Sequence, residues 1–479
     1  MAASSCPCPS CGCSTNNLLS SSLSPPSPRV AELLASNEPP SDTERVAISD
    51  ENEQLMRQIA ELNTCISRTE ASLERLRAGK DALRAQLTAR THILNPIRTL
   101  PTDILYEIFA RCIDRDESTS KEKVPWILAT VSRRWRTTAI AFSQMWSHIT
   151  INLDDLSVAF ERRRYDRCYN RLSLRMQRAR QYPLSLHLIS ESQSLEGFPD
   201  IVRVLSETSH CWKQLILHGR LPLFNSLLAR ELPLPLLQAV DMDVDMGVGV
   251  NTSSSSVFRN ASSLAHLTVP VDVLLQFKWP VSQIIACTVS PAYSAIPNSR
   301  ACGVIRRFSR LQVLSYSMET WSIDEPRESP ITLLSLTKLT LDLSSLSSGD
   351  QLLEALVLPK LTHLWLKGTL NSNTVPWILS LHARSNFNLF SLTFDPNVED
   401  IKPEIVFNFL KAFPRISELY FCSRCRYLGK ILMRLAEETT MAPNLKVLSL
   451  NEVRVTSSAK YLPVLASSRP DLYVQYHLY

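Results

Sequence analysis

The C-terminal part of the chain repeats one spacing of apolar residues. A first apolar residue is followed by a second three positions later and a third two positions after that, as at Leu361, Leu364 and Leu366. The central positions of ten copies are mostly 25 to 29 residues apart: Leu215, Val240, Leu267, Cys287, Leu314, Leu339, Leu364, Leu392, Leu419 and Leu448. Weaker copies begin at Trp146 and Pro183. Apolar residues two apart face one side of a short strand.

This period is that of leucine-rich repeats, which have about 20–29 residues. Helical stretches separate several copies, as over 351–357, 376–383, 404–413 and 428–438. Residues 182–479 are therefore predicted to form an α/β leucine-rich-repeat-like solenoid in which each repeat packs against its neighbours. A polar segment over 241–263 interrupts the array and is interpreted as a loop insertion.

The N-terminal part is predicted to be mainly α, beginning with a heptad register over residues 47–94. One core series is Ile48, Leu55, Leu62, Thr69, Leu76 and Leu83, and the other is Asn52, Ile59, Ile66, Leu73, Lys80, Leu87 and Leu94. Two such series indicate a coiled coil. Two hypotheses stay open: an amphipathic helix folded back on the next domain, or a parallel homodimer.

Residues 96–150 predict three short helices. Pro101 suits a first helical turn, and Asp103 complements the helix N-terminus. The first helix carries an apolar stripe, the second starts at Pro125, and a third short piece follows; their apolar positions are Ile104, Leu105, Ile108, Phe109, Cys112, Leu128, Val131, Trp135, Ala139, Phe142, Met145 and Trp146. About fifty residues rarely complete a core, so a partner or a neighbouring domain is expected to cover the rest.

These positions resemble the F-box. Its pattern matches Leu100-Pro101, Ile104-Leu105, Ile108-Phe109, Leu128, Val131, Trp135 and Met145-Trp146, with a charged loop over 114–123 as the departure. The coiled coil before it resembles a large group of F-box proteins of mushroom-forming fungi. The resemblance implies the substrate-recognition subunit of an SCF-type, cullin-RING ubiquitin ligase. Its F-box would dock on a Skp1-like adaptor, which binds the cullin, and its repeats would bind a protein target.

The resemblance and the strand pattern each suggest contact residues. The adaptor-binding candidates are Leu100, Pro101, Ile104, Leu105, Ile108, Phe109, Val131 and Trp135. Outward-facing strand residues are the target-binding candidates: Gln214, Ser315, Thr340, Trp365, Thr393, Tyr420 and Ser449. We expect no catalytic residues, metal or cofactor, because no nucleophile, phosphate-binding or dinucleotide motif is present. The alternative functions are a non-ligase scaffold that dimerises through its coiled coil, or a nucleic-acid binder.

The second alternative rests on residues 151–181, a basic helical connector. Eight arginines lie there: Arg162, Arg163, Arg164, Arg167, Arg171, Arg175, Arg178 and Arg180. A solvated basic face is the favoured interpretation. The net charge of the 479-residue chain is only +5, which does not by itself indicate nucleic acid.

Residues 1–46 are rich in Ser, Pro and Cys and are predicted to be disordered. Four thiols, Cys6, Cys8, Cys11 and Cys13, could bind zinc or copper(I), but no second cluster follows, so incidental cysteines are favoured. A lone pair, Cys422 and Cys425, is interpreted as packing. A calcium loop after Asp241 is disfavoured, because Thr252 stands where a bidentate Glu is required. With no signal peptide and no membrane-spanning run, the expected location is intracellular, cytoplasmic or nuclear.

Overall fold

The structure is a computed structural model that describes residues 27–114, 123–156, 162–246, 255–291, 303–317, 330–343, 351–371, 373–396, 401–422, 427–450 and 461–476. The predictions for the four N-terminal cysteines, Thr252, Cys425 and most of the charged loop fall outside these ranges. The chain divides into two compact units, Met1–Pro101 and Thr102–Tyr479, and each is described by itself. In the described ranges, no helix is long and apolar enough to cross a bilayer.

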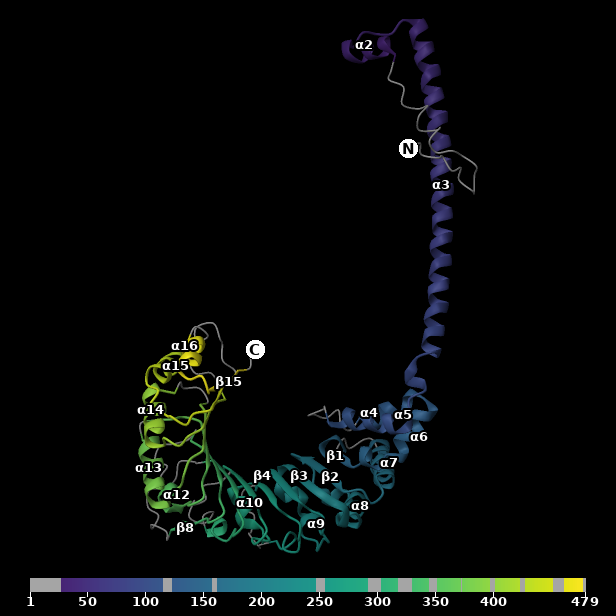
Figure 1. Ribbon diagram of the computed structural model, residues 1–479. Helices are drawn as coiled ribbons and strands as arrows, with labels where there is room; N and C mark the ends of the chain where they lie inside the picture. The colour runs from purple at the N-terminus through teal and green to yellow at the C-terminus, as the bar shows by residue number, and fades with distance from the viewer. Residues whose placement is uncertain are drawn as a thin grey trace. The chain divides into compact units, whose positions relative to one another are not determined.

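The first unit contains the helices α2 (Pro28–Ser36) and α3 (Asp42–Ile93) and the short 3-10 helix η1 (Pro96–Arg98) (Figure 1). The disorder predicted for residues 1–46 is therefore wrong from Pro28 onward. Local capping explains the difference. The Ser27 hydroxyl accepts a hydrogen bond from the Val30 N–H, and Pro28 occupies the first helical position, where its fixed φ favours the helix.

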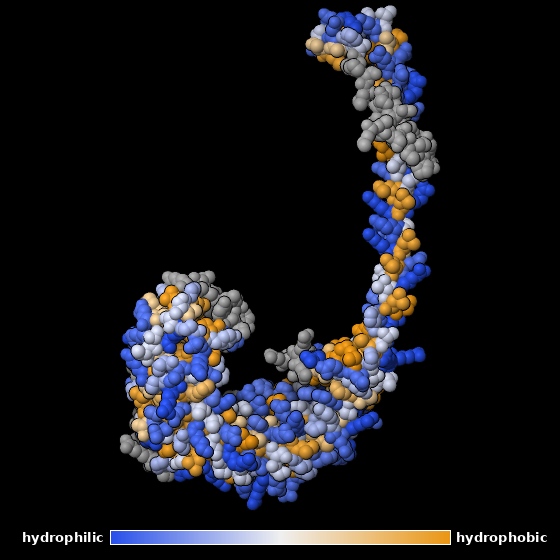
Figure 2. All heavy atoms as spheres, in the orientation of Figure 1, coloured by the Kyte–Doolittle hydropathy of each residue, from blue (hydrophilic) through white to orange (hydrophobic). Residues whose placement is uncertain are grey.

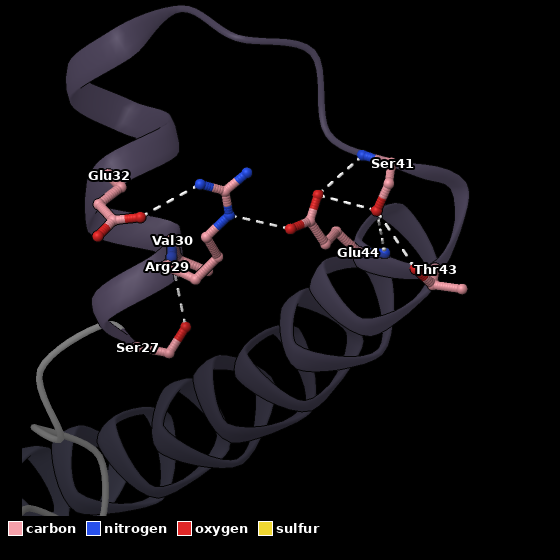
Figure 3. Close-up of polar contacts among 7 residues, drawn as sticks. All are labelled: Ser27, Arg29, Val30, Glu32, Ser41, Thr43 and Glu44. Carbon is pink, nitrogen blue, oxygen red and sulfur yellow. Dashed lines mark hydrogen bonds and ion pairs between the residues drawn. The ribbon is translucent and has the colours of Figure 1, made fainter.

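A capping box begins α3. The Glu44 carboxylate accepts a hydrogen bond from the Ser41 N–H at 2.8 Å, and the Ser41 hydroxyl accepts one from the Glu44 N–H. The Arg29 guanidinium on α2 lies 2.9 Å from the same carboxylate (Figure 3). The backbone hydrogen bond from Ser41, followed by the hydrogen bond from Arg29, lowers the pKa of Glu44 to about 2. These contacts hold α2 against the start of α3.

The long helix predicted over 47–94 is confirmed. The helix α3 has 52 residues, and none of them is buried. Its apolar side chains remain open to solvent, as at Leu55 (49% exposed) and Leu76 (72% exposed). Figure 2 shows hydrophobic side chains along its length.

The second unit is built on a 13-stranded parallel sheet whose strands pair in chain order. The strands are β1 (His148–Asn152), β2 (Leu184–Ser190), β3 (Trp212–Arg220), β4 (Ala239–Asp245), β5 (His266–Pro270), β6 (Ala286–Ser290), β7 (Val313–Ser317), β9 (Lys338–Asp342), β11 (His363–Lys367), β12 (Ser391–Asp395), β13 (Glu418–Phe421), β14 (Val447–Leu450) and β15 (Tyr473–Tyr476). This continuous chain-order pairing makes the unit a leucine-rich-repeat-like α/β solenoid.

Helices cover the outer side of this curved array, and the strands line its inner side (Figure 1). The main ones are α7 (Arg162–Ala179), α8 (Pro199–Glu207), α9 (Asn225–Leu228), α10 (Val271–Gln276), α12 (Gln351–Ala355), α13 (Thr374–Ser385), α14 (Pro403–Ala412), α15 (Leu428–Glu437) and α16 (Leu462–Ser468). The helical stretches predicted near 376–383, 404–413 and 428–438 correspond to α13, α14 and α15. A predicted helix over 351–357 ends at Ala355, because Leu356–Val357 forms β10 and pairs with β8 (Ile331–Thr332).

The predicted inward positions form the core of the sheet. All ten central apolar residues, from Leu215 to Leu448, pair with one another in a single cross-strand ladder. Each has at most 1% of its surface exposed. Burial raises the pKa of the Cys287 thiol in this ladder to about 12, so the residue behaves as a small apolar side chain. The strand prediction is confirmed residue by residue.

Shared backbone carbonyls complete the turns that precede the strands. The Gln312 carbonyl accepts hydrogen bonds from the N–H groups of Thr337 and Lys338 at 2.9 and 3.0 Å, and the Thr337 carbonyl accepts from Thr362 and His363 at the same distances. The hydroxyls of Thr337 and Thr362 donate to the same two carbonyls at 3.2 and 3.1 Å. Shared acceptors and Thr side chains therefore satisfy the polar groups of these turns.

Two predicted boundaries are wrong. The sheet begins with β1, inside the segment 96–150, so the helical module and the repeats belong to one unit. The loop insertion over 241–263 is also shorter than predicted, because β4 extends to Asp245 and residues from Val257 onward pack against the repeats. Phe258 is fully buried, and its ring stacks on Trp279 at a centroid distance of 5.0 Å.

Candidate functional site

The helices α4 (Thr102–Asp114), α5 (Val124–Val131) and α6 (Arg133–Ala141), with the 3-10 helix η3 (Ser143–Trp146), form the helical module. The Ser132 hydroxyl accepts a hydrogen bond from the Trp135 N–H at 3.1 Å and begins α6. The rings of Phe109 and Trp135 lie edge to face at 5.2 Å, and the Trp146 indole N–H donates to the Ala139 carbonyl at 2.8 Å. These contacts close an aromatic core.

The module places the adaptor-binding candidates in two environments. Leu105, Phe109 and Trp135 are 0%, 0% and 9% exposed, so they pack in the interior and do not form its surface. The side chains of Ile104 and Val131 are 47% and 57% exposed, and Ile108 is half-buried. In the first unit, which precedes α4 in sequence, Leu100 is half-buried and Pro101 is exposed.

Two further aliphatic side chains reach the surface of the module and were missed by the sequence analysis. Ile127 is 58% exposed, and Ile140 is 37% exposed. Ile127 lies four residues before Val131, so the two side chains share one face of α5. This i,i+4 spacing is the signal that could have identified Ile127. We define the aliphatic face as Ile104, Ile108, Ile127, Val131 and Ile140; Figure 2 shows hydrophobic surface around α4 and α5.

The basic helix α7 packs against the same module. The Arg178 guanidinium lies 4.4 Å from the ring centroid of Trp146 and 5.2 Å from that of Trp126, and the Arg171 guanidinium lies 5.4 Å from Trp126. Arg175 is only 2% exposed. Desolvation lowers the pKa of Arg178. Arg171 and Arg178 therefore join α7 to the module; the side chains of residues 162–164 lie outside the described part of the chain.

The inner face of the sheet brings together six of the seven target-binding candidates. Each pairs with the next across adjacent strands from β7 to β14, in the order Ser315, Thr340, Trp365, Thr393, Tyr420 and Ser449. The seventh, Gln214, lies outside this row: Ile216 holds the matching position on β3, and Gln214 accepts a hydrogen bond from Ser185 at 2.8 Å. Ser449 is only 4% exposed, so its side chain offers little contact surface.

Two aromatic residues stand out in this row. Trp365 is 37% exposed, and the Lys367 ammonium lies 4.5 Å from its ring centroid. The Tyr420 hydroxyl donates to the Glu418 carboxylate at 3.2 Å. Desolvation and, secondarily, the Glu418 charge raise the pKa of Tyr420. Aromatic side chains such as these are enriched at protein–protein interfaces, whereas Lys, Glu and Ser are depleted there.

A polar cluster on β2, β3 and β4 was also missed. The His218 imidazole lies 3.2 Å from an Asp243 carboxylate oxygen and 3.7 Å from a Glu191 oxygen. Desolvation and the Asp243 charge raise the pKa of Asp241, and desolvation lowers the pKa of His187. These aspartates lie along strand β4 and not in a loop. In the part of the chain that the structure describes, no three His, Cys, Asp or Glu residues are grouped to hold a metal ion.

No family model matches the chain, and no curated protein matches it. Among solved structures, the crystal structure of a TLR13–ssRNA13 complex is similar, with 17% sequence identity and a TM-score of 0.30. The match covers 60% of this chain and 45% of that chain, so this chain spans less than half of that structure. The assignment of a leucine-rich-repeat-like fold rests on the strand order and register described above.

Proposed function

We propose that this protein is the substrate-recognition subunit of a cullin-RING ubiquitin ligase. The helical module would dock on a Skp1-like adaptor, and the inner face of the sheet would bind a protein target. The observation that carries the proposal is the aliphatic face: the module has a closed aromatic core of its own, yet it leaves Ile104, Ile127 and Val131 about half exposed.

The energetics favour a partner for this face. Fully burying an aliphatic side chain contributes about 1.5–3 kcal/mol, so covering the remaining half of one isoleucine or valine contributes about 1 kcal/mol. Three such residues give about 3 kcal/mol, which is less than the free energy lost when two proteins associate. Ile108, Ile140 and the Leu100-Pro101 dipeptide before α4 are therefore expected to add contacts. The anchors that we now favour are Ile104, Ile108, Val131, Leu100 and Pro101.

The row on the sheet supports the second half of the proposal. Aromatic residues dominate the binding energy of many protein interfaces, and Trp365 with Tyr420 are the large aromatic side chains in the row. The hydroxyls of Ser315, Thr340 and Thr393 can hydrogen-bond to a partner. A target held on this surface would gain a high effective concentration near the transfer enzyme of the ligase, so the receptor itself needs no catalytic group.

The test is the capture of a purified Skp1-like adaptor by the full chain. Ile104→Glu combined with Val131→Glu places two charges on the aliphatic face and is expected to weaken capture by about 100-fold, because two charged groups would be desolvated. The matched control is Leu334→Glu combined with Val464→Glu. Those side chains are 63% and 55% exposed on the solenoid, and capture should not change.

Two results would reject the docking site. The wild-type chain could fail to bind any adaptor, or the Ile104/Val131 variant could bind as tightly as the control. Tryptophan fluorescence of each variant checks that the second unit remains folded, since none of the eight tryptophans precedes Trp126.

A further inference from the structure

Apolar side chains recur along α3 with the heptad spacing of a coiled coil. When Asn52 is placed at position a, the other a positions include Ile59, Ile66 and Leu73, and the d positions include Leu55 and Leu62. The exposed fractions are 49% for Leu55, 56% for Ile59 and 53% for Ile66. Figure 2 shows hydrophobic surface at several places along α3. A β-branched residue at a with Leu at d favours two parallel strands.

We propose that α3 pairs in parallel and in register with α3 of a second copy of this chain. This inference goes beyond the adaptor docking proposed above and does not depend on it. Positions a, d, e and g each occur seven times between Ile48 and Leu94, which gives 28 contact positions per chain. A stable protein interface uses roughly 20–30 residues on each side, so the helix is long enough to hold a dimer by itself.

The polar core positions select the parallel orientation. In register, Asn52, Thr69, Lys80 and Arg90 each meet their own copy, so four core layers between Ile48 and Leu94 contain polar residues. In an antiparallel pair centred on the same helix, Asn52 would face Leu83, Thr69 would face Ile66, and Lys80 would face Leu55. Each of these layers would occur twice, with a polar residue against an apolar one, and Arg90 would face Arg45. Parallel pairing therefore reduces the number of polar layers and lets Asn52 hydrogen-bond to its own copy.

Charges at the flanks permit this arrangement. In a parallel pair a g residue lies beside the e residue five positions later in the partner. Glu51 then meets Met56, and Arg77 meets Ser72. In the same way, Glu70 meets Cys65 and Arg84 meets Gly79, so no two like charges face each other at these flanking e and g positions.

Overall charge gives a weaker and opposite preference. The first half of α3 is acidic and its second half is basic, as Asp50 and Glu53 against Arg68 and Arg75 illustrate. This polarity by itself would favour antiparallel pairing. Most of these side chains sit at outer heptad positions, where salt screens them beyond about 8 Å. The composition of the core layers is therefore expected to determine whether the two helices pair in parallel or antiparallel.

A parallel dimer would release both second units from the same end of the helices. Each unit carries one inner sheet face, so two recognition surfaces would be linked in one particle. A target with two copies of the recognised feature would then bind with avidity.

The association state tests the proposal. Light scattering on the purified full chain should give twice the chain mass of 54.0 kDa. Ile66→Asp with Leu73→Asp puts charges at two a positions and should weaken self-association by at least about 100-fold. The matched control, Ala71→Asp with Ala78→Asp, puts the same charges on the opposite side of the helix and should remain dimeric. A monomeric wild type, a trimer, or equal behaviour of both variants would overturn the proposal.

Orientation needs a second measurement. Donor and acceptor fluorophores fused to the N-termini of separately tagged chains should transfer energy when the helices are parallel. In an antiparallel pair the two starts of the 52-residue α3 would lie about 78 Å apart, at about 1.5 Å per residue, and transfer would be lost. A dimer without transfer would overturn the parallel register. Adaptor capture by the Ile66/Leu73 variant should equal that of the wild type, which separates this test from that of the proposed function.

Discussion

Helix α3 and the solenoid strands are both regularly spaced apolar segments, but only the strands bury their apolar residues within the chain. Leu76 on α3 is 72% exposed, whereas Leu364 on β11 is 1% exposed. Each strand between β1 and β15 has a paired strand on either side, and the repeat period returns the next apolar pair to the same place. Among the described residues of its own unit, the helix has no comparable neighbour beyond α2, which contacts its first turn.

The solenoid and α3 therefore owe their stability to different interactions. The solenoid is held by tertiary packing, so its strands do not need high intrinsic propensity. A single exposed helix depends on propensity and capping, and α3 accordingly uses a capping box and many Ala, Leu, Glu and Arg residues. The helical module lies between these cases, because it closes an aromatic core but leaves its aliphatic face open.

The largest loss of stability is expected for Gly219→Ala on β3. Gly219 has a φ of 120° and pairs with Ser190 on β2, and a Cβ atom built there would overlap the Ser190 carbonyl. The substitution should lower the free energy of unfolding of the second unit by about 4 kcal/mol or prevent folding, because backbone strain and strand separation add. Urea unfolding followed by tryptophan fluorescence measures it.

Gly197→Ala is the matched control for this variant. Gly197 ends η5 (Leu195–Gly197), and a Cβ there meets nothing within 4 Å. The urea midpoint of the Gly197→Ala variant should differ little from that of the wild type. If Gly219→Ala unfolds at the wild-type urea concentration, the close approach of β2 and β3 is not a constraint on the sheet.

The buried apolar positions of the solenoid strands were largely predictable from the sequence. The same spacing recurs in many copies, so an uncertain assignment in one copy is corrected by the others. The central positions from Leu215 to Leu448 all fall in one ladder. The last strand, β15, was missed because the terminal repeat is atypical: Asp471 stands where the pattern requires its first apolar residue. The pair β8 and β10 is only two residues long on each side and has no pattern to detect.

The candidate sites were predicted less completely. Six row residues follow from strand alternation, but Gln214 was assigned to the wrong row because the exposed position on β3 is occupied by the apolar Ile216. For the module, an apolar stripe does not distinguish the inside of a three-helix unit from a docking face. Leu105 and Ile104 are adjacent in sequence, yet one is fully buried and the other is 47% exposed. Only the packing of the helices shows which of the two residues is buried and which is exposed.

A matched pair of leucine truncations should show the next largest effect. Leu364→Ala in the central ladder should lower the free energy of unfolding of the second unit by about 3 kcal/mol, through lost burial and an unfilled cavity. Leu76→Ala removes the same atoms from an exposed site in the other unit. Tryptophan fluorescence reports the second unit alone, so its urea midpoint should match the wild type for Leu76→Ala. Equal losses for both variants would refute the contrast between the two regions.

The smallest change in stability is expected for Gly79→Ala on α3, and it is a gain where the preceding variants give losses. A Cβ at Gly79 meets nothing within 4 Å, so the substitution adds no clash, unlike the one at Gly219. Glycine inside a helix is about 1 kcal/mol less favourable than alanine, so the variant should stabilise this part of α3. Hydrogen exchange of peptides from residues 70–90 in the full chain should slow by about 5-fold, and tryptophan fluorescence should not change.

The neighbouring change Ala78→Gly provides the reciprocal control, because it introduces the same backbone freedom that Gly79→Ala removes. Exchange around residue 78 should become faster by a similar factor. If α3 were held mainly by packing, as the strands are, neither substitution at an exposed position would follow the propensity scale. Opposite and nearly equal shifts would mean that local propensity sets the stability of α3, and unchanged exchange in both variants would contradict this explanation.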